Sequence, residues 1–253
     1  MSYSTIVAAV EKNIQLILEA ERYIWAHPEI GYKEVKTTAY MVEAFEKLGY
    51  NVVRPEGITG FIADLDTGRP GPKVAILAEL DSLICADHPE CDPATHAVHA
   101  CGHHAQSAYL IGCAAAFAEP HVLDELCGSI RFVSVPAEET IDLEFRNRKI
   151  EEGVIHYPAG KIEFLYRGLL DGVNIAMMNH VTPDDNGYLF DLHDGSDGCI
   201  VKHFEFLGKA AHAGVSPWDG INALYAANVG MTACNALREK FREKDYVRFH
   251  PII

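Results

Sequence analysis

The chain of 253 residues is predicted to be an α/β protein. Segments with apolar side chains at helical spacing alternate with short apolar runs typical of strands, and glycine and proline residues separate them. The length allows one large domain or two smaller ones with a substantial core. The pattern changes near residue 200, so we predict two domains, residues 1–197 and 198–253.

The first predicted domain begins with two helices, followed by strands. Apolar residues recur at helical spacing over residues 5–26 and again up to Gly49, which ends the second helix. A polar, turn-rich segment at 83–100 is predicted to be a loop, and a helix is predicted to begin near Cys101. Apolar runs bounded by turn residues predict strands at 59–65, 74–80, 129–135 and 173–178.

The second predicted domain has a β-α-β pattern. A strand is expected at 201–207, a long helix at about 220–241, and a further strand at 246–249, where the chain ends soon afterwards. A β-α-β run of this size indicates part of a small domain rather than a complete one. We therefore expect the second domain to be incomplete.

Composition and charge exclude several functional classes. The formal net charge of −15 argues against binding to nucleic acids or to anionic membranes. The N-terminus lacks the basic start of a signal peptide, and no apolar stretch is long enough to span a membrane. The seven cysteines are odd in number and scattered, which is typical of a reducing cytoplasm. We expect a cytoplasmic protein.

Cys101 and His103 are separated by one glycine at the start of a predicted helix. A thiolate and an imidazole at this spacing suit a zinc-like ion, and a helix N-terminus lowers the pKa of a thiol. The alternative is a buried structural cysteine beside an exposed histidine, because such a pair also arises by chance.

Glu138 and Glu139 directly follow an apolar strand and Pro136. Adjacent carboxylates point in different directions, so one can bind a metal ion while the other acts as a general base. The alternative is an exposed acidic turn, although the buried character of the preceding strand places the pair at the rim of a sheet. Asp81, after another strand, is placed to orient a ligand histidine or to cap its strand.

Two further histidines are candidates only in combination with these residues. His180 follows a short apolar strand, and His212 lies in a turn rich in glycine and alanine that lets another surface approach closely. Each alone is an ordinary histidine at the edge of a core or in a turn. The loop histidines His88, His96 and His99 have no predicted role.

Several segments, taken in order, form a longer pattern from about residue 20 to the last residue. They are His27-Pro28-Glu29-Ile30-Gly31 with Glu34 and Thr37, residues 78–83, 99–104 and 136–139, Gly160-Lys161 with Gly168 and Asp171-Gly172, His180, and 208–213 with Asn222-Ala223. The pattern resembles the M20 family of metal-dependent amidohydrolases and peptidases. Within the family it is most similar to the branch of aminoacylases, hippurate hydrolases, auxin-conjugate hydrolases and aminobenzoyl-glutamate hydrolases.

The resemblance implies a fold and a set of roles. The fold is a mixed-sheet catalytic domain of the zinc-peptidase type with helices on both faces, plus part of a smaller α+β lid or dimerisation domain. Two divalent metal ions are implied, with zinc preferred and manganese, cobalt or nickel as alternatives. The implied metal ligands are Cys101, His103, Glu139 and His180; the implied catalytic residues are Glu138 as general base and His212, from the lid of a dimer partner, on the tetrahedral intermediate.

The sequence also departs from this family. His104 stands where the branch usually has aspartate, Gln106 where it has histidine, and Glu79 where it often has aspartate. Family members continue well beyond residue 253 and supply another metal-binding histidine there. We therefore expect a C-terminally truncated chain, one half of a split gene, or a fragment.

Two functional hypotheses follow from the resemblance. The first is a metal-dependent amidohydrolase that cleaves the amide bond of an N-acyl amino acid or a peptide-like conjugate, works on a small-molecule substrate and forms a homodimer through its lid. The alternative is a catalytically inactive homologue, or half of a split enzyme, that binds metal or oligomerises.

Overall fold

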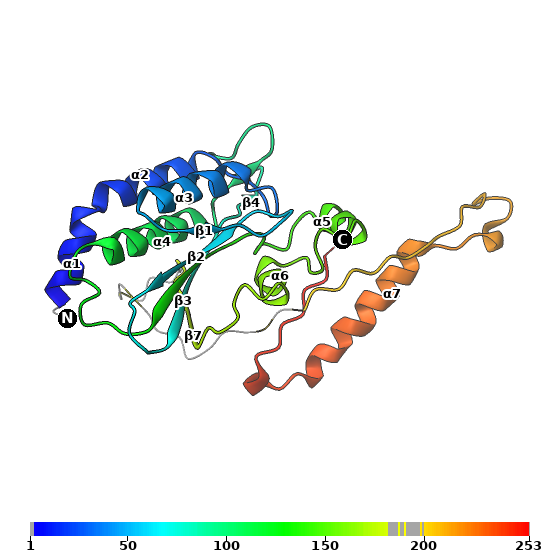
Figure 1. The fold of residues 1–253 in the computed structure, drawn as a ribbon. Helices are drawn as coiled ribbons and strands as arrows, with labels where there is room; N and C mark the ends of the chain where they lie inside the picture. The colour runs from blue at the N-terminus through cyan, green and yellow to red at the C-terminus, as the bar shows by residue number, and fades with distance from the viewer. Residues whose placement is uncertain (1–2, 182–186, 188–189, 191–197, 199, 253) are drawn as a thin grey trace. The chain divides into compact units, whose positions relative to one another are not determined.

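The computed structural model describes residues 3–181, 187, 190, 198 and 200–252. The chain divides into two compact units, Met1–Asp184 and Asp185–Ile253. Figure 1 traces the chain through both units. The domain boundary predicted after residue 197 falls on a residue outside the described part of the chain and remains a prediction.

A five-stranded mixed sheet forms the centre of the first unit, in the order β1-β2-β6-β3-β7. β1 and β6 each pair antiparallel with β2, whereas β3 pairs parallel with both β6 and β7. The three parallel strands therefore end at the same edge, with Glu79 paired to Val135 in register. The strands are Val52–Val53 (β1), Phe61–Asp66 (β2), Lys73–Glu79 (β3), Ser129–Val135 (β6) and Ile175–Met178 (β7).

Four helices lie together on one side of this sheet (Figure 1). Between them and the sheet lies an apolar core in which the rings of Phe45, Phe61 and Phe132 meet. Burial of these apolar faces supplies most of the stability of such amphipathic helices. The helices are Tyr3–Lys12 (α1), Ile14–Trp25 (α2), Val35–Lys47 (α3) and His103–Ala118 (α4).

The opposite face of the sheet carries a second, smaller core. Phe164 of α6 (Gly160–Tyr166) is fully buried and packs with Leu77, Val133 and Val135 of the sheet. Helix α5 (Leu143–Glu151) lies between β6 and α6 in sequence. Helices thus cover both faces of a mixed sheet, which confirms the predicted fold class.

Gly160, the first residue of α6, packs directly against the residues that follow β6. A Cβ atom at this position would collide with the carbonyl oxygen of Pro136, so only glycine lets the helix approach this closely. The first turn of α6 is thereby brought next to the Glu138–Glu139 pair.

The predicted loop at 83–100 contains a small hairpin. Leu83–Ile84 (β4) pairs antiparallel with Ala97–Val98 (β5), and tight turns fill the segment between them. The strands have two residues each, too short to produce a recognisable pattern in the sequence.

The second unit is centred on α7 (Ala223–Ala236), which the Asn222 side chain caps by accepting a hydrogen bond from the amide of Tyr225. Three 3₁₀ helices accompany it: Pro217–Asp219, Leu237–Lys240 and Glu243–Asp245. Residues 201–207 and 246–249, predicted to be strands, form none. A strand needs a partner for its backbone groups, and the bridge of Lys209 with Ile221 is the one pairing among the described residues of this unit.

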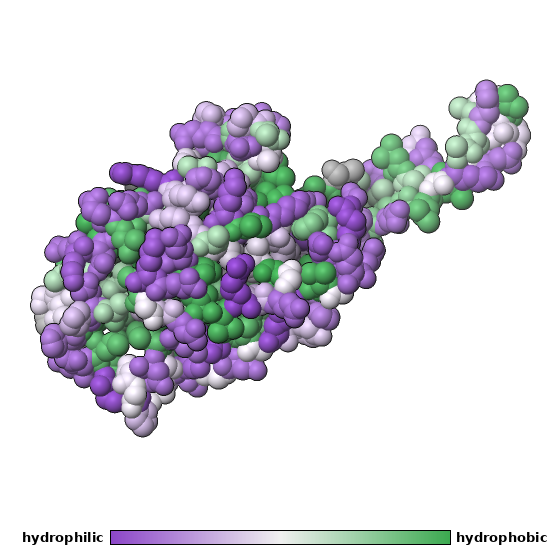
Figure 2. Space-filling model, turned by 45° about the horizontal axis from the view of Figure 1, so that its top comes forward, coloured by the Kyte–Doolittle hydropathy of each residue, from purple (hydrophilic) through white to green (hydrophobic). Residues whose placement is uncertain are grey.

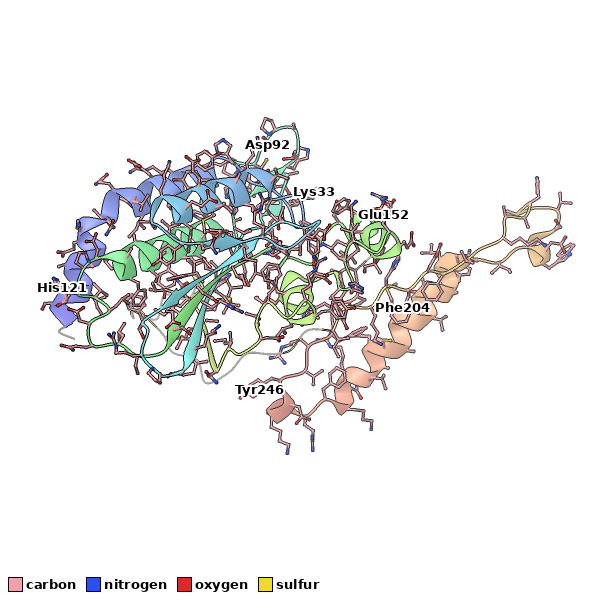
Figure 3. All side chains as sticks on the ribbon, viewed as in Figure 1. Lys33, Asp92, His121, Glu152, Phe204 and Tyr246 are labelled. Atoms are coloured by element: carbon pink, nitrogen blue, oxygen red, sulfur yellow. The ribbon has the colours of Figure 1, made fainter. Side chains whose placement is uncertain are left out.

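Polar residues cover most of the surface visible in Figure 2, with apolar residues scattered among them, as the acidic composition leads one to expect. Within the described residues, no helix combines the length and the apolar character that crossing a membrane requires. Figure 3 shows the side chains on the ribbon of Figure 1.

Phe132→Ala is expected to destabilise the first unit by about 3–5 kcal/mol, because it empties a fully buried ring site. The ring contacts Phe45, Tyr50 and Phe117, at centroid distances of 5.4, 5.3 and 6.4 Å. Urea unfolding measures the loss. The control is Phe204→Ala, at a ring that is 71% exposed and is expected to change stability by less than about 0.5 kcal/mol. Equal losses in the two variants would contradict the assigned core.

Candidate metal centre

The candidate site lies at the edge of the sheet where the parallel strands end. Asp81 follows β3, Glu138 and Glu139 follow β6, and His180 follows β7. Because β3, β6 and β7 run parallel, these side chains gather at one edge, the usual place for ligands in such sheets. Helix α4 begins at the same edge with His103.

Cys101, His103 and His180 form one group of ligand atoms. Their ligand atoms all lie within 4.8 Å of one another, and Sγ of Cys101 is 3.5 Å from Nε2 of His180. The turn into α4 depends on Gly102, which has a φ of 96° and whose Cβ, if present, would collide with Val181. One thiolate and two imidazoles are a ligand set that zinc prefers.

Hydrogen bonds of both histidines determine which ring nitrogen is free. Nδ1 of His103 lies 2.8 Å from the carbonyl oxygen of Asp81, and Nδ1 of His180 lies 2.7 Å from that of Val181. A carbonyl only accepts, so each Nδ1 must carry the hydrogen, and in the neutral ring each Nε2 keeps its lone pair. Nε2 of His103 is also buried and lacks a hydrogen bond of good geometry within the described part of the chain. These residues therefore fit a divalent metal ion.

Glu79, His103 and Glu138 form a second group of ligand atoms within 4.8 Å of one another. Nε2 of His103 is 3.1 Å from the carboxylate of Glu79 and 4.0 Å from that of Glu138. Nζ of Lys161 pairs with Glu79 and lies 3.9 Å from Oε1 of Glu138. His103 is therefore shared by two neighbouring ligand groups.

The charges in the second group shift the pKa values of its three members. Burial raises the pKa of Glu79, but His103 and Lys161 outweigh burial and lower it to about 2. Burial likewise lowers the pKa of His103, but Asp81 and Glu79 outweigh it and raise the value to about 10. Burial and the nearby Glu79 carboxylate raise the pKa of Glu138. A half-buried carboxylate with a raised pKa is suited to general-base chemistry near neutral pH.

Glu139 lies against the Cys101 thiol. Burial raises the pKa of Cys101 to about 12, and a hydrogen bond with Glu139 contributes to the rise. The thiol of the metal-free protein is therefore protonated, and metal binding must displace that proton. Glu139 is close to the first ligand group without being one of its three members.

Asp81 connects the ligands to the general base. Its carbonyl oxygen accepts from His103, while its two carboxylate oxygens accept from the amides of Glu138 and Glu139, at 3.1 and 2.9 Å. The sequence suggested Asp81 as a partner that orients a ligand histidine. Its two bonds to the amides of the glutamate pair were not anticipated.

The two departures from the M20 pattern beside Cys101 and His103 have different environments. Gln106 accepts from the amide of Glu79 at 2.8 Å and donates to the carbonyl of Asn179 at 2.5 Å, so it ties the end of β3 to the residue before His180. His104 points away from the ligand groups, with its ring against Trp25 and its Nε2 3.4 Å from Glu21.

The structure thus brings five of the six predicted site residues to one edge of the sheet: Cys101, His103, Glu138, Glu139 and His180. His212 belongs to the second unit, on an exposed turn where its Nδ1 accepts from the amide of Gly214. Glu79, Lys161 and Arg146 were assigned no role from the sequence. The signal for Glu79 was available, since it ends a strand two residues before Asp81.

Several known amidohydrolases are similar to this chain over most of its length. No family model matches the chain. An N-acyl-L-amino acid amidohydrolase of Geobacillus stearothermophilus is 27% identical over 82% of this chain and 52% of that protein. A subunit of the p-aminobenzoyl-glutamate hydrolase of Escherichia coli (strain K12) is 29% identical over 98% of this chain and 48% of that protein.

A solved structure provides the family name. The crystal structure of the Bacillus subtilis YXEP protein, a dinuclear metal-binding peptidase from the M20 family, matches with a TM-score of 0.55 and 28% identity. The match covers 67% of this chain and 43% of that one. The chain is thus similar in sequence and in fold to a member of the M20 family. This confirms the predicted resemblance, and the chain spans about half the length of the curated relatives it matches.

Proposed function

We propose that this chain is a member of the M20 family and carries the metal centre of an amidohydrolase that cleaves the amide bond of an N-acyl amino acid or a peptide-like conjugate. The observation that carries the proposal is the position of Glu138 beside His103, which belongs to both ligand groups. The names of the relatives, an N-acyl-L-amino acid amidohydrolase and a p-aminobenzoyl-glutamate hydrolase, support the class of substrate.

The proposed ligands are Cys101, His103, Glu139 and His180, with Glu79 as an additional carboxylate at the second group. The thiolate favours zinc, whereas the carboxylates of the second group also suit manganese, cobalt or nickel. Two bound divalent ions would polarise the substrate carbonyl and lower the pKa of an attacking water molecule. The chain's own residues then provide the proton transfers and hold the substrate.

Glu138 is the proposed general base. Its carboxylate is half-buried, its pKa is raised, and its main chain is held by Asp81, so it can take a proton from an attacking water and deliver it to the leaving amine. Lys161, 3.9 Å from Glu138, places a positive charge next to this carboxylate in the ionised state.

His212 is proposed to stabilise the oxyanion of the tetrahedral intermediate. Because Nδ1 of His212 accepts a hydrogen bond from Gly214, the neutral ring carries its proton on Nε2 and can donate it to an oxyanion. We propose that the second unit also mediates a homodimer. The exposed apolar side chains of α7 support this: Leu224, Tyr225 and Val229. The scattered cysteines support a cytoplasmic location.

Glu138→Gln is expected to lower the hydrolysis rate of N-acetyl amino acids by about 10²–10⁴-fold, since an amide side chain cannot take up the proton. Elemental mass spectrometry should find that the metal ion bound at Cys101, His103 and His180 is retained, because Glu138 is not a member of that ligand group. Glu144→Gln is the control, at an exposed acid on α5 that pairs with Arg148 one turn along the helix. Wild-type turnover in Glu138→Gln, or a wild-type chain that binds no metal, would contradict the proposal.

A further inference from the structure

The four-residue segment 136–139, which we call the glutamate turn, is held through its main chain by the side chains of two acidic residues and an arginine. Glu34 accepts from the amide of Ala137 at 2.8 Å, and Asp81 accepts from the next two amides. Ala137 is fully buried and has a φ of 53°, a left-handed conformation that is uncommon for residues other than glycine. This conformation directs the two glutamate side chains and requires support from its surroundings.

Arg146 supports the turn from the carbonyl side. Its Nη2 donates to the carbonyl oxygen of Glu139, and its Nη1 donates to that of Pro158 at 2.8 Å. Both main-chain groups of Glu139 are therefore hydrogen-bonded, the amide to Asp81 and the carbonyl to Arg146. With its backbone held in this way, its side chain remains against the Cys101 thiol.

The burial of Arg146 distinguishes it from an ordinary surface arginine. Its side chain is fully buried, both of its hydrogen bonds end on backbone carbonyls, and its Nε has no hydrogen-bond partner among the described residues. A Cβ atom at Gly31 would collide with Nη2, so the chain leaves space for the guanidinium there. Burying a guanidinium is costly, and such groups concentrate where they serve a site.

Helix α5 carries Arg146 and is itself held in place at its start. Arg146 lies in the middle of the helix, which ends at Glu151, just before the Glu152 labelled in Figure 3. The start of the helix is tied to the segment between α2 and α3 by an ion pair between Lys33 and Asp142 at 2.7 Å. The Arg146 guanidinium thus connects helix α5 to the glutamate turn.

From these contacts we propose that Arg146 is a positioning residue, which holds the glutamate turn so that Glu139 reaches the metal centre and Glu138 its general-base position. The inference rests on the proposed function, because it needs a metal ion at Cys101, His103 and Glu139. In this role Arg146 touches neither the metal ion nor the substrate, and it acts on the metal centre through the main chain of Glu139.

The test is a cobalt(II) titration of the full chain, followed by absorption spectroscopy. The variants are Arg146→Met, which keeps most of the volume but cannot donate, and Arg146→Lys, which keeps the charge but cannot make both bonds. Arg146→Met is expected to weaken cobalt binding about 10–100-fold, the effect typical of losing a group that orients a ligand. The thiolate-to-cobalt charge-transfer band from Cys101 should persist, while the visible ligand-field band of cobalt changes. The cobalt affinity of Arg146→Lys should fall between those of wild type and Arg146→Met.

Arg167→Met is the matched control. Arg167 also donates to two backbone carbonyls, those of Glu56 and Val154, and both of these lie outside the glutamate turn. The Arg167→Met variant should be less stable than wild type but should bind cobalt with wild-type affinity. Cobalt binding by a folded Arg146→Met at wild-type affinity, or an equal loss in Arg167→Met, would overturn the inference. If Arg146→Met does not fold, an unchanged affinity and spectrum in Arg146→Lys overturns it. A wild-type chain that binds no cobalt would overturn the proposed metal centre, and the inference with it.

Discussion

Alanine in place of His103 is expected to abolish tight metal binding at both ligand groups. His103 is the one residue shared by the two groups, and its Nε2 lies 3.1 Å from the carboxylate of Glu79 and 4.0 Å from that of Glu138. Losing an outer partner of a ligand typically costs 10–100-fold in affinity, so losing the ligand itself should cost more than about 100-fold. Isothermal titration with zinc and elemental mass spectrometry of the purified chain measure the effect.

His104→Ala is the control for this experiment, because His104 is the next residue of the same helix. Its ring contacts Trp25 and its Nε2 approaches Glu21, away from both ligand groups. Metal content should therefore stay at the wild-type value. Should His103→Ala retain its metal while His104→Ala loses it, the assignment of the ligands would be wrong.

The second large effect concerns Glu34, a fully buried carboxyl group. Burial, with a further contribution from Asp81, raises the pKa of Glu34 from 4.5 to about 8. The folded protein therefore holds a proton that the unfolded chain releases between these two values. Since the unfolded state binds fewer protons there, Glu34 makes the free energy of unfolding fall as pH rises from about 4.5 to 8.

Glu34→Gln should remove this contribution. Glutamine remains neutral at every pH, so the variant should gain stability relative to wild type as pH rises through this window. Its side-chain amide oxygen can still accept from the amide of Ala137. Urea unfolding of both proteins at pH 5 and at pH 8 measures the difference.

Glu163→Gln provides a control of opposite sign. Glu163 is also buried, but Arg167 and the amides of His156 and Tyr157 outweigh burial and lower its pKa. A lowered pKa contributes stability that is present above about pH 4.5 and is lost as pH falls below it. The difference between Glu163→Gln and wild type should therefore stay nearly constant from pH 5 to pH 8 and shrink only at lower pH. If the difference between Glu34→Gln and wild type does not change with pH, the titration assigned to Glu34 is wrong.

The sequence predicted the parts of the molecule that depend on local pattern. The alternation of helices and strands predicted an α/β architecture, and the position of Glu138 and Glu139 after an apolar strand predicted their place at a sheet edge. The mixed sheet was implied only by the resemblance to the M20 family. Cys101 and His103 were identifiable because they lie two residues apart.

Contacts between distant segments were not predictable in the same way. The ion pair of Lys161 with Glu79 and the bond from Arg146 to Glu139 depend on how α5 and α6 pack, which no local pattern reveals. In the described part of the second unit, the apolar run at 201–207 has strand-like composition but no strand beside it. β-propensity describes how a residue fits a paired surface, so it misleads where the pairing does not form.

The parallel pairing of β3 with β6 also determines when the site can form during folding. These strands are not neighbours in sequence, and no local hairpin can bring Asp81 to the amides of Glu138 and Glu139. The entropy of closing that long loop is lost before any contact compensates for it, which makes such pairings slow. Before the sheet forms, Cys101 and His103 are close together along the chain, but Glu139 and His180 are still remote from them. Tight metal capture should therefore follow completion of the sheet, as a late event in folding.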